Sequence, residues 1–324
     1  MRRLVIRLLT TVQLTRLTMA FGAVSDLWFV ILLARALDPE GPLSAPRHAL
    51  PEALGAGAIV AVGLFAFGAS LNDLLDSRHD TAFSPDRPIP AGRIKASQAV
   101  IVTIGSLLAA MVAAVFFGEA GLLLAALVAA GILFYNAAGK HIPAIGLVAI
   151  GAIHATHMFI PEPGLAFTLP VWLVATHVTG LALAIYVIEE KRPALTRRSV
   201  AALVLGYLAL SSLLLGLGAW RAGAGGLWPE GRSLAGLAWP ALAVVAFVAV
   251  ARRKSAGVSG RVAAEKLHRY GAMWQSLYGA AWLAALGLDA PAIWLGLFAV
   301  AGFASMTIIK EINGATGRPV TFRG

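Results

Sequence analysis

Residues 52–80 read EALGAGAIVAVGLFAFGASLNDLLDSRHD, an apolar run that ends in a cluster of acid and amide side chains. A helix needs roughly 20 mostly apolar residues to cross the hydrocarbon core of a bilayer, and residues 52–72 meet that length. The whole 324-residue chain has this character, because 59% of its residues are hydrophobic and only 13% are charged. Soluble domains are about half apolar and about a quarter charged, so this composition excludes an ordinary soluble protein. We therefore predict an all-α, polytopic transmembrane helical bundle.

Ten stretches of the chain have the length and composition of a membrane-spanning helix. They lie near residues 17–37, 52–72, 97–117, 120–136, 142–160, 169–189, 199–219, 235–252, 271–287 and 291–309. The ninth is the weakest because it is short and begins in an amphipathic segment, so we expect nine or ten helices. No linker is long enough to separate domains, and residues 1–324 are expected to form a single domain.

Basic residues are distributed unevenly between the two sides that alternating spans define. If the N-terminus is cytoplasmic, 22 of the 26 Lys and Arg residues fall on the cytoplasmic side. The positive-inside rule then predicts cytoplasmic termini and cytoplasmic loops after the even-numbered spans, in the cell inner membrane. The net charge of +10 comes from short basic clusters between apolar runs, so we expect a lipid bilayer and no nucleic acid as partner. The sequence leaves the oligomeric state open.

The acid and amide side chains after the second span follow a helical spacing. Asn72, Asp76 and Asp80 stand at positions i, i+4 and i+8, so they stack on one face if the helix continues. Like charges at that spacing repel, and hard oxygen ligands suit Mg²⁺, which accepts one or two carboxylates and takes substrate phosphates at other positions. Asp73 points about 100° away around the helix, so we expect it to act as a cap or a supporting group.

Basic side chains follow the acids within the same loop, namely Arg78, Arg87, Arg93 and Lys95. Carboxylates that hold a metal beside cations that hold phosphate oxygens are typical of a diphosphate site. The alternative is a solvated turn that only caps the helix, but the stacked spacing and the neighbouring bases favour a binding site.

These residues resemble a known motif. The pattern N-D-x-x-D-x-x-x-D over residues 72–80, followed by R-P-I-P-x-G-R over residues 87–93, is similar to the first aspartate-rich motif of the UbiA superfamily of intramembrane prenyltransferases. Tyr135-Asn136 and Lys140 after the fourth span add to the resemblance. Members of that superfamily have nine helices around a central lipid-open cavity. The resemblance therefore implies a core over about residues 10–290, with 291–309 as an additional helix.

The resemblance also implies an activity: Mg²⁺-dependent transfer of a prenyl group from an isoprenoid diphosphate to a membrane-soluble acceptor, aromatic or lipid-like, with release of pyrophosphate. The catalytic residues that it implies are Asp76, Asp80 and Lys140. The metal ligands that it implies are Asn72, Asp76, Asp80 and Glu190. The candidates for diphosphate binding are Arg87, Arg93, Tyr135, Lys140, Lys191 and Arg192.

The second acidic motif of the superfamily, commonly D-x-x-x-D after the sixth span, is altered here. Residues 186–194 read YVIEEKRPA, so Glu190 takes the place of the first acid and Ala194 that of the second. Pro193 disfavours helical stacking across the motif. One interpretation is that Mg²⁺ binds at the first motif while Lys191 or Arg192 neutralises phosphate charge. The others are an altered reaction on a prenyl substrate, a lost activity with binding or transport retained, and a charged helix end.

Three histidines lie inside predicted spans: His154 and His157 in the fifth and His177 in the sixth. Ionisable groups within a bilayer usually face the bundle interior or a cavity. We consider interior hydrogen bonds, contacts in an acceptor pocket and a metal site, although thiolate ligands are excluded because the chain has no cysteine. Asp26 in the first span is expected to be buried and paired.

Two further functions remain open from the sequence. A terpene cyclase would ionise the same diphosphate and quench the carbocation internally, a chemistry that aromatic faces usually support. A carrier of prenyl lipids would bind the diphosphate without turnover, as the missing acid at Ala194 suggests.

Overall fold

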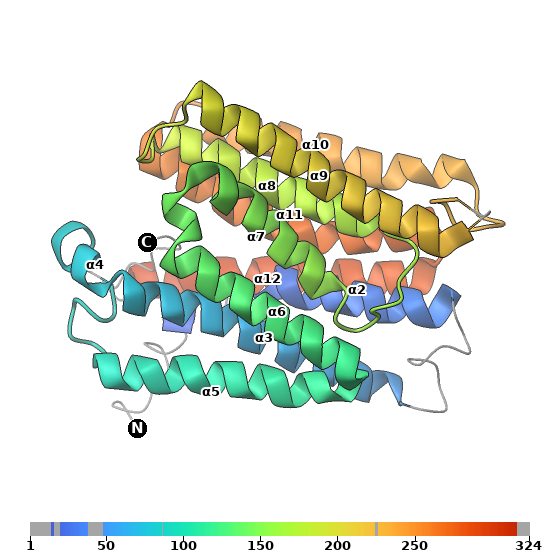
Figure 1. The fold of residues 1–324 in the computed structure, drawn as a ribbon, viewed down its shortest axis with the longest axis horizontal. Helices are drawn as coiled ribbons and strands as arrows, with labels where there is room; N and C mark the ends of the chain where they lie inside the picture. The colour runs from blue at the N-terminus through green and yellow to red at the C-terminus, as the bar shows by residue number, and fades with distance from the viewer. Residues whose placement is uncertain (1–13, 16–19, 38–47, 86, 224–225, 316–324) are drawn as a thin grey trace.

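The computed structural model describes residues 14–15, 20–37, 48–85, 87–223 and 226–315, with residues 309–315 as backbone alone. Within these residues every regular element is a helix (Figure 1). The long helices are α2 (Phe21–Leu37), α3 (Leu50–Leu75), α5 (Ala96–Ala114), α6 (Gly118–Ala137), α7 (Pro143–Met158), α8 (Leu169–Ile188), α9 (Arg197–Ala222), α10 (Ala238–Ser255), α11 (Gly260–Ala285) and α12 (Asp289–Ala315). The prediction of an all-α bundle of nine or ten helices is confirmed.

By length and composition alone, six helical stretches of the described chain are apolar enough to cross a membrane. They are Leu50–Leu75, Ala96–Ala137, Leu169–Ile188, Arg197–Ala222, Leu234–Ser255 and Asp289–Ile308. The second of these is two helices, α5 and α6, because the 3₁₀ turn η2 (Val115–Phe117) intervenes and α6 begins at Gly118. Gly118 has φ +77°, a conformation that glycine adopts without the steric penalty of a side chain, and the chain reverses there from α5 into α6. The protein is thus an integral membrane protein.

Successive long helices run in alternating directions, as the predicted spans require (Figure 1). The links α3–α5, α6–α7, α8–α9 and α10–α11 all lie at one end of the bundle. The short helix α4 (Ser77–Phe83) lies at that same end. The acidic loop after the second span and the altered motif after the sixth are therefore brought to one side of the molecule.

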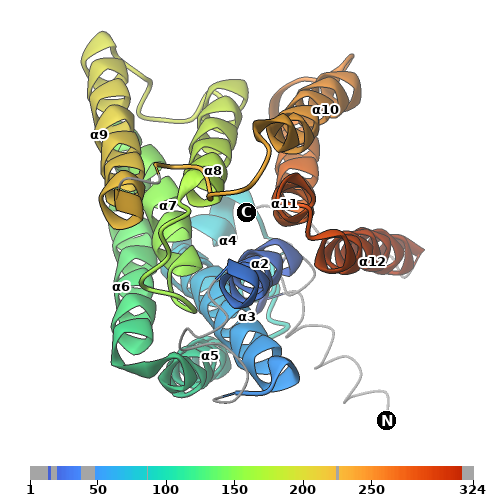
Figure 2. The same cartoon turned by 90° about the vertical axis from the view of Figure 1, so that its right-hand side faces the viewer.

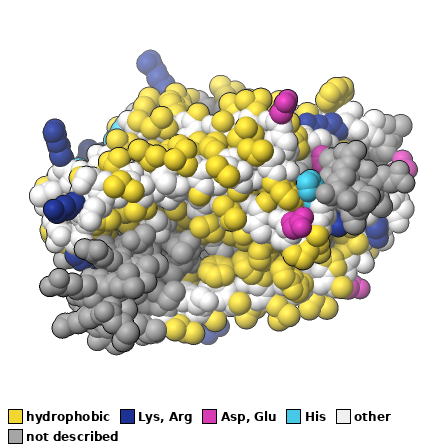
Figure 3. Space-filling view, turned by 90° about the horizontal axis from the view of Figure 1, so that it is seen from below, with side chains coloured by type: hydrophobic (Ala, Val, Ile, Leu, Met, Phe, Trp, Pro, Cys, Tyr) yellow, Lys and Arg dark blue, Asp and Glu magenta, His cyan; other side chains and the backbone are white. Residues whose placement is uncertain are grey.

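Apolar side chains cover the outside of the bundle as well as its interior. Figure 3 shows hydrophobic side chains across the middle of one face and charged side chains mainly toward its ends. On the outer helices, Leu205 of α9 is 67% exposed and Val245 of α10 is 65% exposed. Such a surface is stable in lipid, which solvates apolar side chains, rather than in water.

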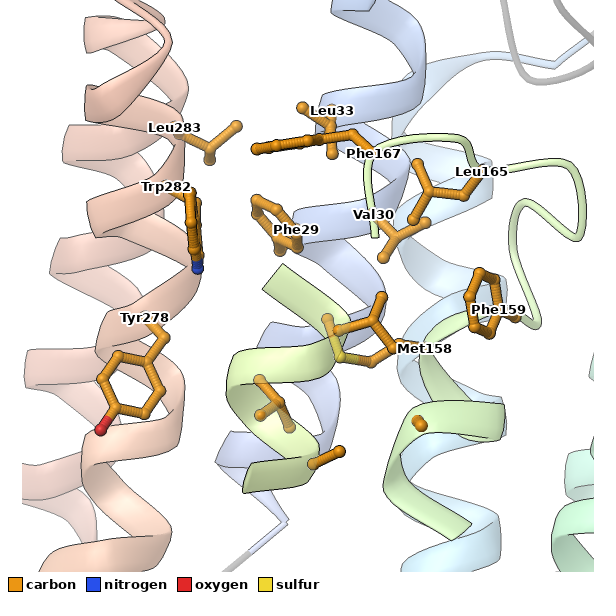
Figure 4. Close-up of a cluster of buried hydrophobic side chains, with 14 of the residues drawn as sticks. Phe29, Val30, Leu33, Met158, Phe159, Leu165, Phe167, Tyr278, Trp282 and Leu283 are labelled. Carbon is orange, nitrogen blue, oxygen red and sulfur yellow. The ribbon is translucent and has the colours of Figure 1, made fainter. Parts of the chain in front are cut away.

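Helix α2 lies inside the bundle, in contact with α3, α7, α11 and α12 (Figure 2). One face of α2, including Phe29, packs with α7 and α11 in a cluster that contains Met158 and Trp282 (Figure 4). The opposite face of α2, including Leu27, packs with α3 and α6 in a second cluster. The two clusters hold the helices that enclose the cavity described next.

Candidate functional site

A cavity of about 430 Å³ lies between α2, α3, α6, α7, α8 and α11. Most of its polar lining gathers toward the end of the bundle that carries α4, and this part includes Asn72, Asp76, Tyr135, Asn136, Lys140, Tyr186, Lys191 and His268. Apolar side chains such as Leu64, Ile132 and Ile150 line its body. A cavity with one charged end and an apolar body suits an amphipathic ligand with an anionic head.

Asn72 and Asp76 of the acidic motif face this cavity together. The backbone N–H of Asp76 donates to the carbonyl of Asn72 at 2.9 Å, so the helical spacing is kept between them. The Lys140 ammonium lies 2.5 Å from Asp76 Oδ1 and 3.3 Å from Asn72 Oδ1. Two oxygen ligands thus converge on one cation at the polar end of the cavity.

Lys140 reaches this position from η3 (Gly139–His141), the turn between α6 and α7. The turn packs directly on the first turns of α7, since a Cβ atom added at Gly146 would lie only 2.4 Å from the Gly139 carbonyl oxygen. Glycine at 146 therefore permits the approach that places Lys140 beside the acids.

Asp80 does not join the other two residues, contrary to the expected stack of three. Helix α3 ends at Leu75, and Asp76 adopts φ −86° and ψ −1° before the chain enters α4. The backbone N–H of Asp80 still donates to the Asp76 carbonyl at 2.8 Å, so the turn between the two residues remains helical. Asp80 nevertheless lies outside the cavity lining, seven residues after Asp73 and so on that residue's side of the turn, where it is buried against Arg87. Burial raises the pKa of the Asp80 carboxyl above its ordinary value, although the ion pair with Arg87 opposes that shift.

Arg87, which the family resemblance implies as a diphosphate ligand, lies away from the cavity. Only 5% of the residue is exposed, and its guanidinium makes ion pairs with Asp80 and, at 3.4 Å, with Asp73. It is not among the residues that line the cavity. The acid and amide side chains of the motif therefore lie in two places. Asn72 and Asp76 face the cavity with Lys140, whereas Asp73 and Asp80 bind the buried Arg87.

Of the remaining residues expected to bind phosphate, two line the cavity and two do not. Tyr135 and Lys191 line the cavity, and Lys191 also pairs with Glu189 at 3.6 Å. Arg93 and Arg192 are not among the lining residues, and Arg192 is exposed.

Glu190, which was expected to bind metal, is exposed and is not among the lining residues. Its φ of +50° places it in the left-handed region, which turns the chain at the end of α8. The altered second motif therefore contributes Lys191 to the cavity, and the Tyr186 hydroxyl, which also lines the cavity, bonds to the Pro193 carbonyl.

Three polar residues that line the cavity are not among the expected site residues: Asn136, Tyr186 and His268. Asn136 stands next to Tyr135 in the sequence, so the motif after the fourth span contained the signal for it. His268 lies in the amphipathic start of α11, and no sequence pattern connects it with the acids.

The three histidines inside the helices lie in two different environments. His154 and His157 line the cavity, whereas His177 is not among the lining residues. The His177 ring bonds through Nε2 to the Gly271 carbonyl at 3.0 Å and through Nδ1 to the Tyr278 hydroxyl at 3.1 Å. His177 thus links α8 to α11.

No group of three or more His, Asp or Glu side chains is arranged to hold a metal ion in the part of the chain that the structure describes. Asn72 Oδ1 and Asp76 Oδ1 nevertheless lie close enough together that the Lys140 ammonium contacts both. That donor set fits Mg²⁺, because Mg²⁺ typically binds to one or two protein carboxylates and completes its shell with water and substrate phosphates.

Comparison with known proteins gives consistent results. The model of the UbiA prenyltransferase family matches residues 27–254. A digeranylgeranylglyceryl phosphate synthase from Methanothrix thermoacetophila is 34% identical over 89 residues, which are 28% of this chain and 33% of that protein. The chain therefore aligns with about a third of the length of this curated relative.

Two solved structures share the fold. One, from a study of digeranylgeranylglyceryl phosphate synthase in membranes, has a TM-score of 0.58 at 16% identity and covers 86% of this chain and 98% of its own. The other is an apo structure of a UbiA homologue from Aeropyrum pernix K1, with a TM-score of 0.54 at 19% identity, covering 83% of this chain and 97% of its own.

Proposed function

Because the chain belongs to the UbiA prenyltransferase family, we propose that it transfers a prenyl group from an isoprenoid diphosphate to an aromatic or lipid-like acceptor and releases pyrophosphate. The observation that carries this proposal is the cavity itself. Its polar end combines Asn72 and Asp76 with Lys140 and Lys191, and its body is apolar. A diphosphate head and an isoprenoid tail match these two environments.

The proposed reaction breaks the bond between the allylic carbon and the diphosphate oxygen, and the acceptor then forms a new bond to that carbon and loses a proton. Negative charge accumulates on the departing pyrophosphate. Lys140 and Lys191 would stabilise it, as preorganised cations do most effectively in a site shielded from water. Mg²⁺, held by Asn72 and Asp76, would supply Lewis-acid stabilisation of the same charge.

The orientation in the membrane is part of the proposal. Both termini and the loops that carry Asp76, Lys140 and Lys191 would face the cytoplasm, in the cell inner membrane, because the basic residues gather on that side. Diphosphates are charged and water-soluble at the head, so the cavity's polar end must open toward an aqueous compartment that contains them.

The test is release of pyrophosphate from a panel of prenyl diphosphates by the purified protein, with and without Mg²⁺, in the presence of membrane lipid extract. We expect release that requires Mg²⁺ and a prenylated lipid that mass spectrometry detects. Release without any added acceptor, together with a cyclic hydrocarbon product, would point to a cyclase. Tight binding of the diphosphate with no release would contradict the transferase and favour a carrier.

A matched pair of substitutions separates the roles of the residues after α8. We expect Lys191→Ala to raise the KM for the prenyl diphosphate by about tenfold to 10²-fold, because a charged hydrogen bond to a phosphate oxygen contributes about 1.5–3 kcal/mol. Glu190→Gln is expected to change KM by no more than about twofold, because Glu190 is exposed and lies outside the cavity. Steady-state kinetics on both variants check this, and a larger effect at Glu190 would argue that the second motif still binds metal.

A further inference from the structure

The cavity has a second polar region, far from its charged end. On α7, His157 is the last residue that lines the cavity, and His154 lies one turn before it. On α3 the lining extends from Asp76 back to Ala61, which is about 16 Å along the helix axis from Asn72. The two histidines therefore lie at the deep end of the cavity, where an apolar tail would be expected to end.

His154 is held by a chain of buried polar groups. Gln275 Nε2 of α11 donates to Asp26 Oδ2 of α2 and lies 3.1 Å from His154 Nδ1. An amide nitrogen has two hydrogens and no acceptor capacity, so it donates to both partners. Nδ1 of His154 is then an acceptor, and in the neutral ring the proton lies on Nε2. The chain Asp26–Gln275–His154 thus fixes a tautomer that presents an N–H donor.

His157 adds an unpaired nitrogen to the same region. The residue is only 5% exposed, and within the described part of the chain its Nε2 makes no hydrogen bond. His154 is half-buried and lines the cavity, with its Nδ1 engaged by Gln275. A buried polar atom without a partner costs about 1–3 kcal/mol, so a ligand that bonds to His157 Nε2 would bind more tightly than one that leaves this nitrogen unpaired.

The charge of this region limits the ligand group. The cations that line the cavity, Lys140 and Lys191, lie in the turns at its other end, and the described lining has no Lys or Arg near the histidines. A phosphate or carboxylate at this depth would be an uncompensated buried charge. A neutral oxygen group meets the requirement, because a hydroxyl can accept from His154 Nε2–H and donate to an imidazole nitrogen.

We propose that His154 and His157, positioned by Gln275 and Asp26, form a deep histidine site that binds a neutral hydroxyl or carbonyl group of the ligand. This inference rests on the proposed function only in taking the ligand to be an isoprenoid donor or its acceptor. The oxygen group belongs either to the far end of the donor's tail or to an acceptor that shares the cavity.

The test compares dissociation constants by calorimetry for the full chain in lipid nanodiscs, in two arms. The donor arm compares farnesyl diphosphate with ω-hydroxyfarnesyl diphosphate. The acceptor arm first saturates the protein with dimethylallyl diphosphate, whose short tail leaves the deep end open, and then compares farnesol with the hydrocarbon farnesene. We expect the wild type to prefer the oxygenated probe about fivefold to tenfold in at least one arm, as one or two neutral hydrogen bonds provide.

Three variants make the result specific. His154→Leu should reduce the preference to about one, whereas His154→Gln, which retains an N–H donor on a side chain of similar reach, should keep part of it. Ile150→Val alters the cavity wall one turn away and should keep the full preference. A preference lost in the donor arm assigns the group to the donor, and one lost in the acceptor arm assigns it to the acceptor.

The deep histidine site is overturned if the wild type shows no preference in either arm, or if His154→Leu preserves the preference. The proposed function has a separate readout, which is Mg²⁺-dependent pyrophosphate release from plain farnesyl diphosphate. Release without any preference contradicts the deep site alone, and a preference without release contradicts the transferase alone.

Discussion

Replacing Asp76 by asparagine is expected to lower the rate of pyrophosphate release about 10²- to 10³-fold. Asp76 is the one carboxylate of the acidic motif that lines the cavity, and its Oδ1 lies 2.5 Å from the Lys140 ammonium. Asparagine keeps the size of the side chain but removes its negative charge, so it weakens both the Mg²⁺ site and the placement of Lys140. Loss of one preorganised electrostatic group at a reacting centre typically costs a factor of this size.

The matched control is Asp80→Asn, the same chemical change on an acid four residues away. Asp80 is buried against Arg87 outside the cavity, so its loss should reduce stability together with activity. Asp76→Asn should leave the apparent melting temperature in detergent almost unchanged while activity falls. Turnover that survives Asp76→Asn, or that survives both substitutions together, would contradict the proposed mechanism.

The difference between these two aspartates shows where prediction from the sequence reaches its limit. The spacing of Asn72, Asp76 and Asp80 is a valid argument only along one uninterrupted helix. Helix α3 ends at Leu75 and α4 begins at Ser77, a boundary that neither hydropathy nor acid spacing encodes, and Asp80 is buried against Arg87 rather than in the cavity lining. Arg87 was assigned to phosphate because it is basic and belongs to the motif, yet its depth in the loop gives it two acids as partners instead.

The helices themselves were predictable because length and apolar composition are local properties that the bilayer selects directly. Contacts between distant residues are not local. Gln275 and Asp26 are 249 positions apart and Gln275 and His154 are 121 apart, so no window along the chain could connect them. Asp26 was expected to be buried and paired, and it is, but its partner emerges only when α2 and α11 pack together.

Replacing Arg87 by leucine is expected to destabilise the protein by about 3–5 kcal/mol, the largest stability effect in the loop between α3 and α5. The side chains of Arg87, Asp73 and Asp80 are 6%, 4% and 5% exposed. Removal of one partner from a buried ion pair leaves an uncompensated charge, and that penalty exceeds what the pair itself contributes. Thermal or chemical unfolding in detergent measures the change, and Arg87→Lys, which keeps the charge but not the two-pronged geometry, should lose less.

Two further measurements identify the cause of that loss as buried charge rather than lost packing. Asp80→Asn combined with Arg87→Leu should be more stable than Arg87→Leu alone, because one of the two carboxylates left without a cation is then neutral.

Lowering the pH should also increase the stability of Arg87→Leu. Burial raises the pKa of Asp80 and the Arg87 charge lowers it, so replacing Arg87 by leucine removes the effect that opposes burial. The folded state then binds a proton more readily than the unfolded state, so the stability of Arg87→Leu increases as the pH falls through the raised pKa of Asp80 toward the ordinary pKa of an unfolded aspartate. A variant that is equally unstable across that range, and that Asp80→Asn does not rescue, would mean that Arg87 stabilises the loop through the packing of its aliphatic stem and not through its charge.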